Sequence, residues 1–187
     1  EIDFEIVFEG PKPNFILLHG YGGSPRDNFF PWLRRELEKR GYEVQAPLLP
    51  HSDKTKANEK DDMDALWKNV KFNKNTILLG HSLGAIVAMK ALERLTHPIR
   101  KLVLVGGFLE SRFRDHARPF FNTFIWNFDF QKIMKNAGHV VILHDTDDHA
   151  ISYDQGEKLH KALGGVLQEP RPEETHFTGK IEPSVLR

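Results

Sequence analysis

The pentapeptide Gly80-His81-Ser82-Leu83-Gly84 is the segment whose residue types and spacing most clearly suggest chemistry. A serine hydroxyl becomes a useful nucleophile when a base accepts its proton and the chain holds it exposed. Glycines two positions before and after the serine allow a sharp turn between a strand and a helix, which presents the hydroxyl. The pattern alone can arise by chance. Here a predicted buried strand at 76–79 precedes it and a predicted helix at 85–95 follows, so we predict that Ser82 is a nucleophile.

A glycine-rich segment, His19-Gly20-Tyr21-Gly22-Gly23-Ser24-Pro25, follows another predicted strand at 15–18. Acyl transfer needs N–H donors for the oxyanion that develops on the substrate carbonyl. With a serine turn of this kind, one donor is the N–H of the next residue, Leu83, and the other comes from a loop after an earlier strand. We assign the second donor to Tyr21. An ordinary glycine-rich turn explains the segment equally well. A phosphate-binding loop fits poorly, because no Lys-Ser or Lys-Thr pair follows the glycines.

A serine nucleophile also needs a histidine base and a carboxylate that holds the histidine tautomer. In one known arrangement the acid and then the histidine follow the serine along the chain. After Ser82, a predicted strand at 140–143 runs into His144-Asp145-Thr146-Asp147-Asp148-His149, where we expect the acid. His176 comes later still, and chain order alone selects it as the base. The residues themselves leave the choice among the three aspartates open.

The remaining histidines and the 144–149 cluster have alternative interpretations. His81 adjoins the nucleophile, so we expect it to pack or form hydrogen bonds locally, and His19 belongs to the glycine-rich loop. Three others are predicted to lie on the surface: His97, His116 and His160. Histidine and aspartate could also bind a metal at 144–149. That site is disfavoured, because the cluster lacks a His-x-x-x-His spacing and occupies the position expected for the acid.

In the elements that must position these residues, short apolar runs alternate with amphipathic stretches along the chain. This alternation predicts a mostly parallel sheet flanked by helices, an α/β fold. The predicted strands are 3–8 at an edge, 15–18, 42–46, 76–79, 102–105 and 140–143. The predicted helices are 29–40, 61–72, 85–95 and 153–163, with 51–60 as a polar loop. A Ser152/Gln155 capping box should open the last helix, and Gly164-Gly165 should close it.

Residues 107–138 depart from this alternation, because they are rich in aromatic residues and too long for an ordinary connection between a strand and a helix. We predict a short helical insertion there, over the end of the sheet. No linker divides the chain, so we expect residues 1–187 to form a single domain.

Composition excludes several classes of function. Lys plus Arg and Asp plus Glu each number 26, which gives no indication of a nucleic acid or an anionic membrane as partner. The absence of Cys excludes disulfides, thiol catalysis and thiolate metal sites. No apolar run approaches the roughly 20 residues of a membrane-spanning helix, and no signal-peptide pattern opens the chain. We therefore expect a cytoplasmic protein without a metal or organic cofactor.

Taken together, several segments resemble the compact serine hydrolases related to retinoblastoma-binding protein nine, which are α/β-hydrolases. The similar segments span nearly the whole chain: 18–25, 32–44, 79–85, 126–133, 146–148 and 176–177. The resemblance implies Ser82 as nucleophile, Asp148 as acid and His176 as base, with esterase or amidase chemistry. Two departures concern the base: Thr175 stands where the family often has Gly, and few residues remain for the helix that usually follows the histidine.

The leading hypothesis is a serine hydrolase that cleaves a small-molecule carboxylic ester or amide through an acyl-enzyme on Ser82. The competing hypothesis is a non-catalytic binding or scaffold protein on the same fold, for which a protein partner is conceivable but not indicated by the sequence. A third is another enzyme on this fold, such as a thioesterase or a lyase.

Overall fold

A parallel sheet forms the centre of the structure, a computed structural model that describes residues 10–110, 122–171 and 174–186. Within these residues the sheet has six strands in the order β2-β1-β3-β4-β5-β6. All the paired strands run parallel. The strands are β1 Asn14–Leu18, β2 Glu43–Gln45, β3 Thr76–His81, β4 Lys101–Val105, β5 His139–Leu143 and β6 Val166–Gln168. The predicted edge strand at 3–8 lies outside the described residues.

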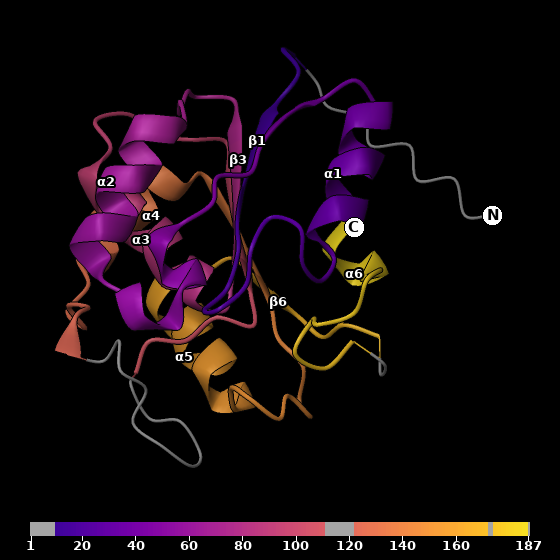
Figure 1. The fold of residues 1–187 in the computed structure, drawn as a ribbon. Coiled ribbons are helices and arrows are strands. Elements are labelled where there is room, and N and C mark those ends of the chain that lie inside the picture. The colour runs from indigo at the N-terminus through magenta and orange to yellow at the C-terminus, as the bar shows by residue number, and fades with distance from the viewer. Residues whose placement is uncertain (1–9, 111–121, 172–173, 187) are drawn as a thin grey trace.

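Helices cover both faces of this sheet (Figure 1). They are α1 Phe30–Lys39, α2 Glu59–Asn69, α3 Leu83–Arg94, α4 Phe130–Ala137, α5 Tyr153–Leu163 and α6 Pro183–Leu186. Two short 3₁₀ turns, η1 Pro50–Ser52 and η2 Lys54–Lys56, lie between β2 and α2. Figure 1 shows α1 and α6 on one side of the sheet and α2, α3 and α4 on the other. The predicted α/β fold, a parallel sheet flanked by helices, is confirmed.

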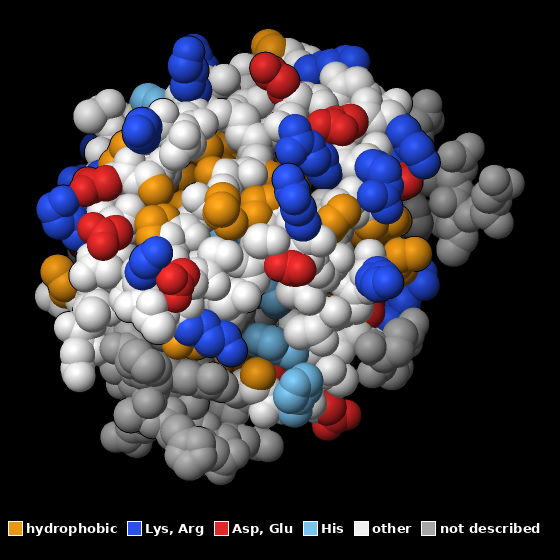
Figure 2. Space-filling view, in the orientation of Figure 1, with side chains coloured by type: hydrophobic (Ala, Val, Ile, Leu, Met, Phe, Trp, Pro, Cys, Tyr) orange, Lys and Arg blue, Asp and Glu red, His pale blue; other side chains and the backbone are white. Residues whose placement is uncertain are grey.

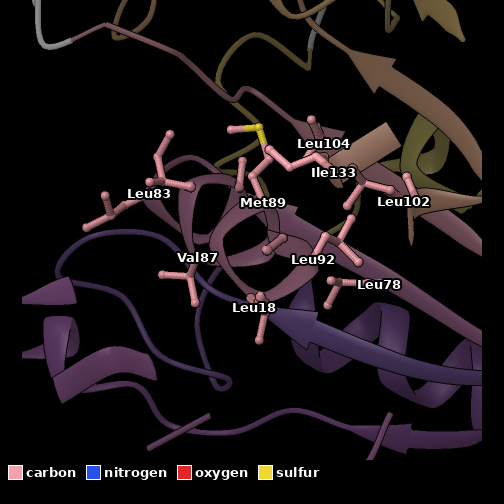
Figure 3. Packing of buried hydrophobic residues seen from close by; sticks show 14 of the residues in the cluster. Leu18, Leu78, Leu83, Val87, Met89, Leu92, Leu102, Leu104 and Ile133 are labelled. Carbon is pink, nitrogen blue, oxygen red and sulfur yellow. The ribbon is translucent and has the colours of Figure 1, made fainter. Parts of the chain in front are cut away.

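The strands alternate their side chains between two apolar cores, one on each face. Ile16, Leu18 and Leu78 point into the larger core with α2, α3, α4 and α5, part of which is shown in Figure 3. Leu17 and Leu79 point into the smaller core with α1. Because β1 and β3 are buried along their whole lengths, they have the continuous apolar sequence of strands that are covered on both sides.

Helix α3 runs through the middle of the larger core. Every residue from Leu83 to Leu92 is buried. Its one buried cation, Lys90, donates from Nζ to the carbonyl oxygen of Asn127 at 2.7 Å and lies 4.3 Å from the ring centroid of Phe128. The core therefore fixes the position and direction of the helix whose first turn carries Leu83.

Two sequence predictions about local structure need correction. Residues 51–60 are not simply a polar loop, because they contain η1, η2 and the start of α2, and His51 is fully buried. The capping box at Ser152 is wrong, since the Ser152 side chain makes no cap hydrogen bond. Gln155 Oε1 instead accepts from the backbone N–H groups of Leu109 and Glu110, at 3.0 and 3.2 Å. The predicted end of α5 is confirmed, with Gly164 at φ 68°.

The predicted helical insertion at 107–138 is described only in part, because 111–121 lie outside the described residues. The helix found there, α4, packs beside α3, where Asn136 Nδ2 donates to the carbonyl oxygens of Leu92 and Leu95, each at 2.9 Å. It is thus a crossover helix in the layer that covers the sheet, rather than an insertion over the sheet's end. Residues 122–129 contain no α-helix and lie against the start of α2, where Ile125 N donates to Glu59 Oε2 at 2.6 Å.

None of the helices in the described part of the chain is both long enough and apolar enough to cross a membrane.

Candidate active site

Ser82 lies at the turn between β3 and α3 in a backbone conformation that non-glycine residues seldom adopt, with φ 54° and ψ −119°. A Cβ on Gly80 would collide with the carbonyl oxygen of Gly84, and a Cβ on Gly84 would collide with that of Leu18. The two glycines are therefore required by close packing of α3 against β3 and β1. Ser82 N donates to the carbonyl oxygen of Val105 at 2.9 Å, which ties the turn to the end of β4. Backbone strain held by surrounding contacts in this way is typical of functional positions.

The two predicted oxyanion donors lie on the segments that flank this turn. Leu83 is the first residue of α3, so its N–H has no acceptor within the helix and lies at the positive end of the helix dipole. Tyr21 lies in the loop after β1, the strand next to β3, with Leu18 in register with Gly80. This loop reaches the nucleophile turn, because a Cβ on Gly20 would lie 3.2 Å from the Cβ of Ser82. The loop after β1 and the first turn of α3 thus both adjoin Ser82.

His176 and Asp148 are joined by a hydrogen bond. Nδ1–H of His176 donates to Asp148 Oδ2 at 2.7 Å. The other carboxylate oxygen of Asp148 accepts from the N–H groups of Ala150 and Ile151, each at 2.8 Å. Burial alone would raise the pKa of Asp148, but the hydrogen bond and charge of His176 and the two N–H groups outweigh it and lower the pKa. Asp148 is therefore an ionised, oriented acceptor that holds the proton of His176 on Nδ1 and leaves Nε2 free to accept one.

Contacts around the strand ends bring this pair to the same edge of the sheet as Ser82. Gly106 follows β4, and a Cβ there would lie 3.3 Å from His176 Nδ1. His81, the residue before Ser82, donates from Nε2 to the carbonyl oxygen of His176 at 2.9 Å, and the two ring centroids are 5.3 Å apart. Burial lowers the pKa of His81 to about 3, so its ring is a neutral support for His176. Figure 2 shows histidine side chains gathered together in one part of the surface.

Asp145 and Asp147 occupy different environments from Asp148. Asp147 is exposed, whereas Asp145 is buried directly after β5. Asp145 Oδ1 accepts from Asp147 N at 3.1 Å, so Asp145 caps this turn. The structure thus pairs His176 with the aspartate that the family resemblance favoured.

Two further histidines lie near this pair: His144 Nε2 is 3.7 Å from Asp148 Oδ2, and the ring centroid of His149 is 6.1 Å from that of His176. His144 donates from Nε2 to the carbonyl oxygen of Ile151 at 2.9 Å, and burial lowers its pKa. His160 is exposed, His97 is partly exposed, and His116 lies outside the described residues. Across the described ranges, no group of three or more His, Asp and Glu side chains is arranged to hold a metal ion.

The segment that carries His176 is held by a second carboxylate. Glu174 is buried and accepts hydrogen bonds from the backbone N–H groups of Arg171 and Ser184, each at 2.9 Å, and from the Ser184 hydroxyl. Ser184 belongs to α6, and Phe177 is fully buried in the smaller core. Helix α6 and the buried Glu174 therefore hold the segment that carries His176. The family resemblance gave no prediction of how this segment packs.

A buried His–Asp pair beneath the glycine-rich loop was not predicted. His51 and Asp62 are both fully buried, and His51 Nδ1 lies 2.7 Å from Asp62 Oδ2. His51 stood in a segment predicted to be a polar loop. A signal was present in α2, because Glu59, Asp62, Met63 and Leu66 fall at the spacing of one buried helical face. That spacing places Asp62 inside the protein.

An apolar cavity of about 150 Å³ lies on the opposite face of the sheet from α3. Phe15, Leu33, Ile77 and Val185 line it, between β1, β3, α1 and α6. Ser82 and His176 are not among its lining residues, so we interpret it as a packing gap rather than a substrate site.

The chain is similar in sequence and in fold to known proteins. Residues 15–180 match the model of the serine hydrolase family. The chain is 27% identical to YdeN of Bacillus subtilis (strain 168) over 157 residues, which are 82% of this chain and 80% of YdeN. It is 26% identical to the serine hydrolase RBBP9 of Rattus norvegicus over 155 residues, or 81% of each chain. The crystal structure of the ydeN gene product superposes with a TM-score of 0.83 at 25% identity, covering 93% of this chain and 95% of the other.

Proposed function

Since the chain belongs to the serine hydrolase family, we propose that it cleaves a small-molecule carboxylic ester or amide through an acyl-enzyme on Ser82. Asp148 and His176 complete a catalytic triad, and the N–H groups of Leu83 and Tyr21 form the oxyanion hole. The mechanism requires no metal or organic cofactor.

In the first half of the reaction, His176 Nε2 accepts the proton of the Ser82 hydroxyl while Oγ attacks the substrate carbonyl carbon. The carbonyl oxygen takes up the negative charge and accepts hydrogen bonds from the N–H groups of Leu83 and Tyr21. The tetrahedral intermediate then expels the alcohol or amine, which leaves with the proton held on His176. The acyl group stays on Ser82 as an ester.

In the second half, water replaces the departed alcohol or amine. His176 accepts a proton from this water, whose oxygen attacks the acyl carbon and displaces Ser82 Oγ. The serine regains its proton from His176, and the product is a carboxylic acid. Asp148 stabilises the imidazolium in both halves without itself becoming protonated.

The 2.7 Å hydrogen bond between His176 Nδ1 and the buried, ionised Asp148 is the observation that best supports this proposal. A scaffold protein has no need for a histidine whose Nδ1–H is held by a buried carboxylate at the edge of the sheet that also carries a strained serine. This arrangement is the one expected of a general base.

Reaction with a fluorophosphonate probe tests the proposal. We expect the wild-type protein to be labelled on Ser82 and to hydrolyse p-nitrophenyl esters. Ser82→Ala should abolish labelling and lower turnover on the order of a million-fold, because nothing replaces the nucleophile. Ser152→Ala, which removes a hydroxyl at the start of α5, is the matched serine control, and heat-denatured wild-type protein is the control for unspecific labelling. Failure of the folded wild-type protein to react would favour the binding or scaffold function.

A further inference from the structure

The loop that carries Tyr21 is held at both ends by one buried residue, His51. Nε2–H of His51 donates to the carbonyl oxygen of His19 at 2.9 Å. The carbonyl oxygen of His51 accepts from the N–H of Gly22, also at 2.9 Å. Tyr21, the proposed oxyanion donor, lies between these two attachment points. The orientation of its peptide group is therefore set by the position of His51.

Asp62 in turn fixes both the backbone and the ring of His51. Its Oδ1 accepts from the backbone N–H of His51 at 3.0 Å, and its Oδ2 lies 2.7 Å from His51 Nδ1. A backbone carbonyl can only accept, so Nε2 of His51 must carry a proton toward His19. The carboxylate of Asp62 faces Nδ1 on the other side of the ring and so fixes the orientation of the ring. Removing either partner leaves a buried polar group without compensation.

Neighbouring contacts hold the same loop from two more sides. His19 Nε2 accepts from the backbone N–H of Leu49 at 2.9 Å, and burial lowers the pKa of His19 to about 4, so its ring stays neutral. The hydroxyl of Tyr21 donates to the carbonyl oxygen of Lys54 at 3.3 Å. Gly22 has φ +72° with the Lys54 side chain against it. The segment from Leu49 to Lys54 thus forms a support for the oxyanion loop.

We infer that Asp62 and His51 form a positioning pair for the oxyanion hole, an inference that rests on the proposed function. Neither side chain is placed to touch the substrate. They act through the peptide groups of the loop and keep the Tyr21 N–H aimed at the developing oxyanion. Such donors work because they are oriented before the reaction begins. A displacement of about 1 Å can cost on the order of a hundredfold in rate.

The test compares His51→Leu, His51→Gln and Asp62→Asn for hydrolysis of an activated ester and of the matched thionoester, in which sulfur replaces the carbonyl oxygen. Sulfur accepts hydrogen bonds weakly, so the preference for the ester reports on the oxyanion hole. We expect His51→Leu to lower kcat about a hundredfold with KM within about threefold of wild type, and to reduce the ester preference. His51→Gln, whose amide N–H can still reach the carbonyl of His19, should recover about tenfold of that loss.

Asp62→Asn preserves volume and isolates the effect of charge. The asparagine amide can donate to a neutral His51 Nδ1, so Nε2–H can remain in place, and we expect a kcat about tenfold below wild type. Asp64→Asn is the matched control, because Asp64 lies exposed on the same helix and should leave all three readouts unchanged. Thermal melts show which variants are folded. If His51→Leu does not fold, Asp62→Asn and His51→Gln decide the matter.

The inference is overturned if the folded variants keep kcat within about threefold of wild type, or if they lose kcat while the ester preference stays unchanged. The two proposals fail in different ways. If wild-type hydrolysis does not depend on Ser82, the proposed function and this inference both fall. If Ser82→Ala is inactive and the Asp62 and His51 variants are fully active, only this inference falls.

Discussion

Asp148→Asn should nearly eliminate turnover while leaving the protein folded. Asparagine can still accept from the N–H groups of Ala150 and Ile151 through its Oδ1, as Asp148 does now at 2.8 Å. Its amide nitrogen, however, would face His176 Nδ1, where an acceptor now lies at 2.7 Å. The imidazole would then carry its proton on Nε2 and could no longer accept the proton of Ser82. Loss of the correct tautomer costs on the order of ten-thousand-fold in kcat, or about 5 kcal/mol of transition-state stabilisation.

The assay is hydrolysis of a p-nitrophenyl ester at fixed pH, with active sites counted by fluorophosphonate titration. Asp145→Asn and Asp147→Asn are the matched controls, since both lie in the same turn without contacting His176. We expect Asp147→Asn to stay within about threefold of wild type, because its side chain is exposed. If a neighbouring substitution abolishes turnover and Asp148→Asn does not, the assignment of the acid is wrong. Loss of folding in Asp148→Asn would also refute the argument that asparagine keeps the hydrogen bonds from the N–H groups of Ala150 and Ile151 and so preserves the fold.

The low pKa of Asp148 also has a consequence for stability. A carboxyl whose pKa is lower in the folded state contributes stability that is fully present above its unfolded pKa of about 3.9. This contribution is lost as pH falls through the folded value. Asp148→Asn should therefore show a weaker loss of stability below about pH 4 than the wild-type protein, as measured by urea denaturation.

Three further predictions follow from packing and burial. Gly84→Ala should destabilise the fold by about 1–3 kcal/mol in urea denaturation and lower activity, because its new Cβ collides with the carbonyl oxygen of Leu18; unchanged stability would contradict the packing described. His19 and His81 have pKa values of about 4 and 3 in the folded protein, below the value of about 6.5 in the unfolded chain. Each histidine should therefore lower the free energy of unfolding by up to about 1.4 kcal/mol per pH unit as pH falls from about 6.5 toward its folded pKa. A flat stability profile over that window would refute this. Glu174→Ala should cost about 1–3 kcal/mol by leaving buried N–H groups unpaired and should also lower kcat; unaltered kinetics would show that α6 does not help to hold the base.

The fold and the serine turn were predictable because their signals are local. Continuous apolar runs such as 15–18 and 76–79 identify buried parallel strands whatever their partners. Glycines around Ser82 identify a tight turn without knowledge of what packs on it. The close contact between Gly84 and Leu18, which makes the glycine necessary, is visible only in the folded chain.

Long-range polar contacts could not be predicted in the same way. Residue types and chain order alone do not separate Asp148 from its neighbours, because adjacent aspartates differ only in which direction the folded turn points them; only the family resemblance favoured it. Gln155 fits a capping-box pattern, yet its side chain binds the backbone of Leu109. His51 is polar and lies in a polar stretch, so its burial against Asp62 depends on the helical face that Asp62 occupies.

The parallel arrangement of the strands offers a practical route to labelling this protein. All the proposed chemistry gathers where the strands end, whereas the connection before β3 lies at the opposite edge of the sheet. The six residues of β3 separate the two edges by about 20 Å. Lys74 lies exposed in that connection, and the chain contains no Cys. A Lys74→Cys variant would therefore carry a single thiol, to which a fluorophore or a surface tether can be attached at a distance from Ser82.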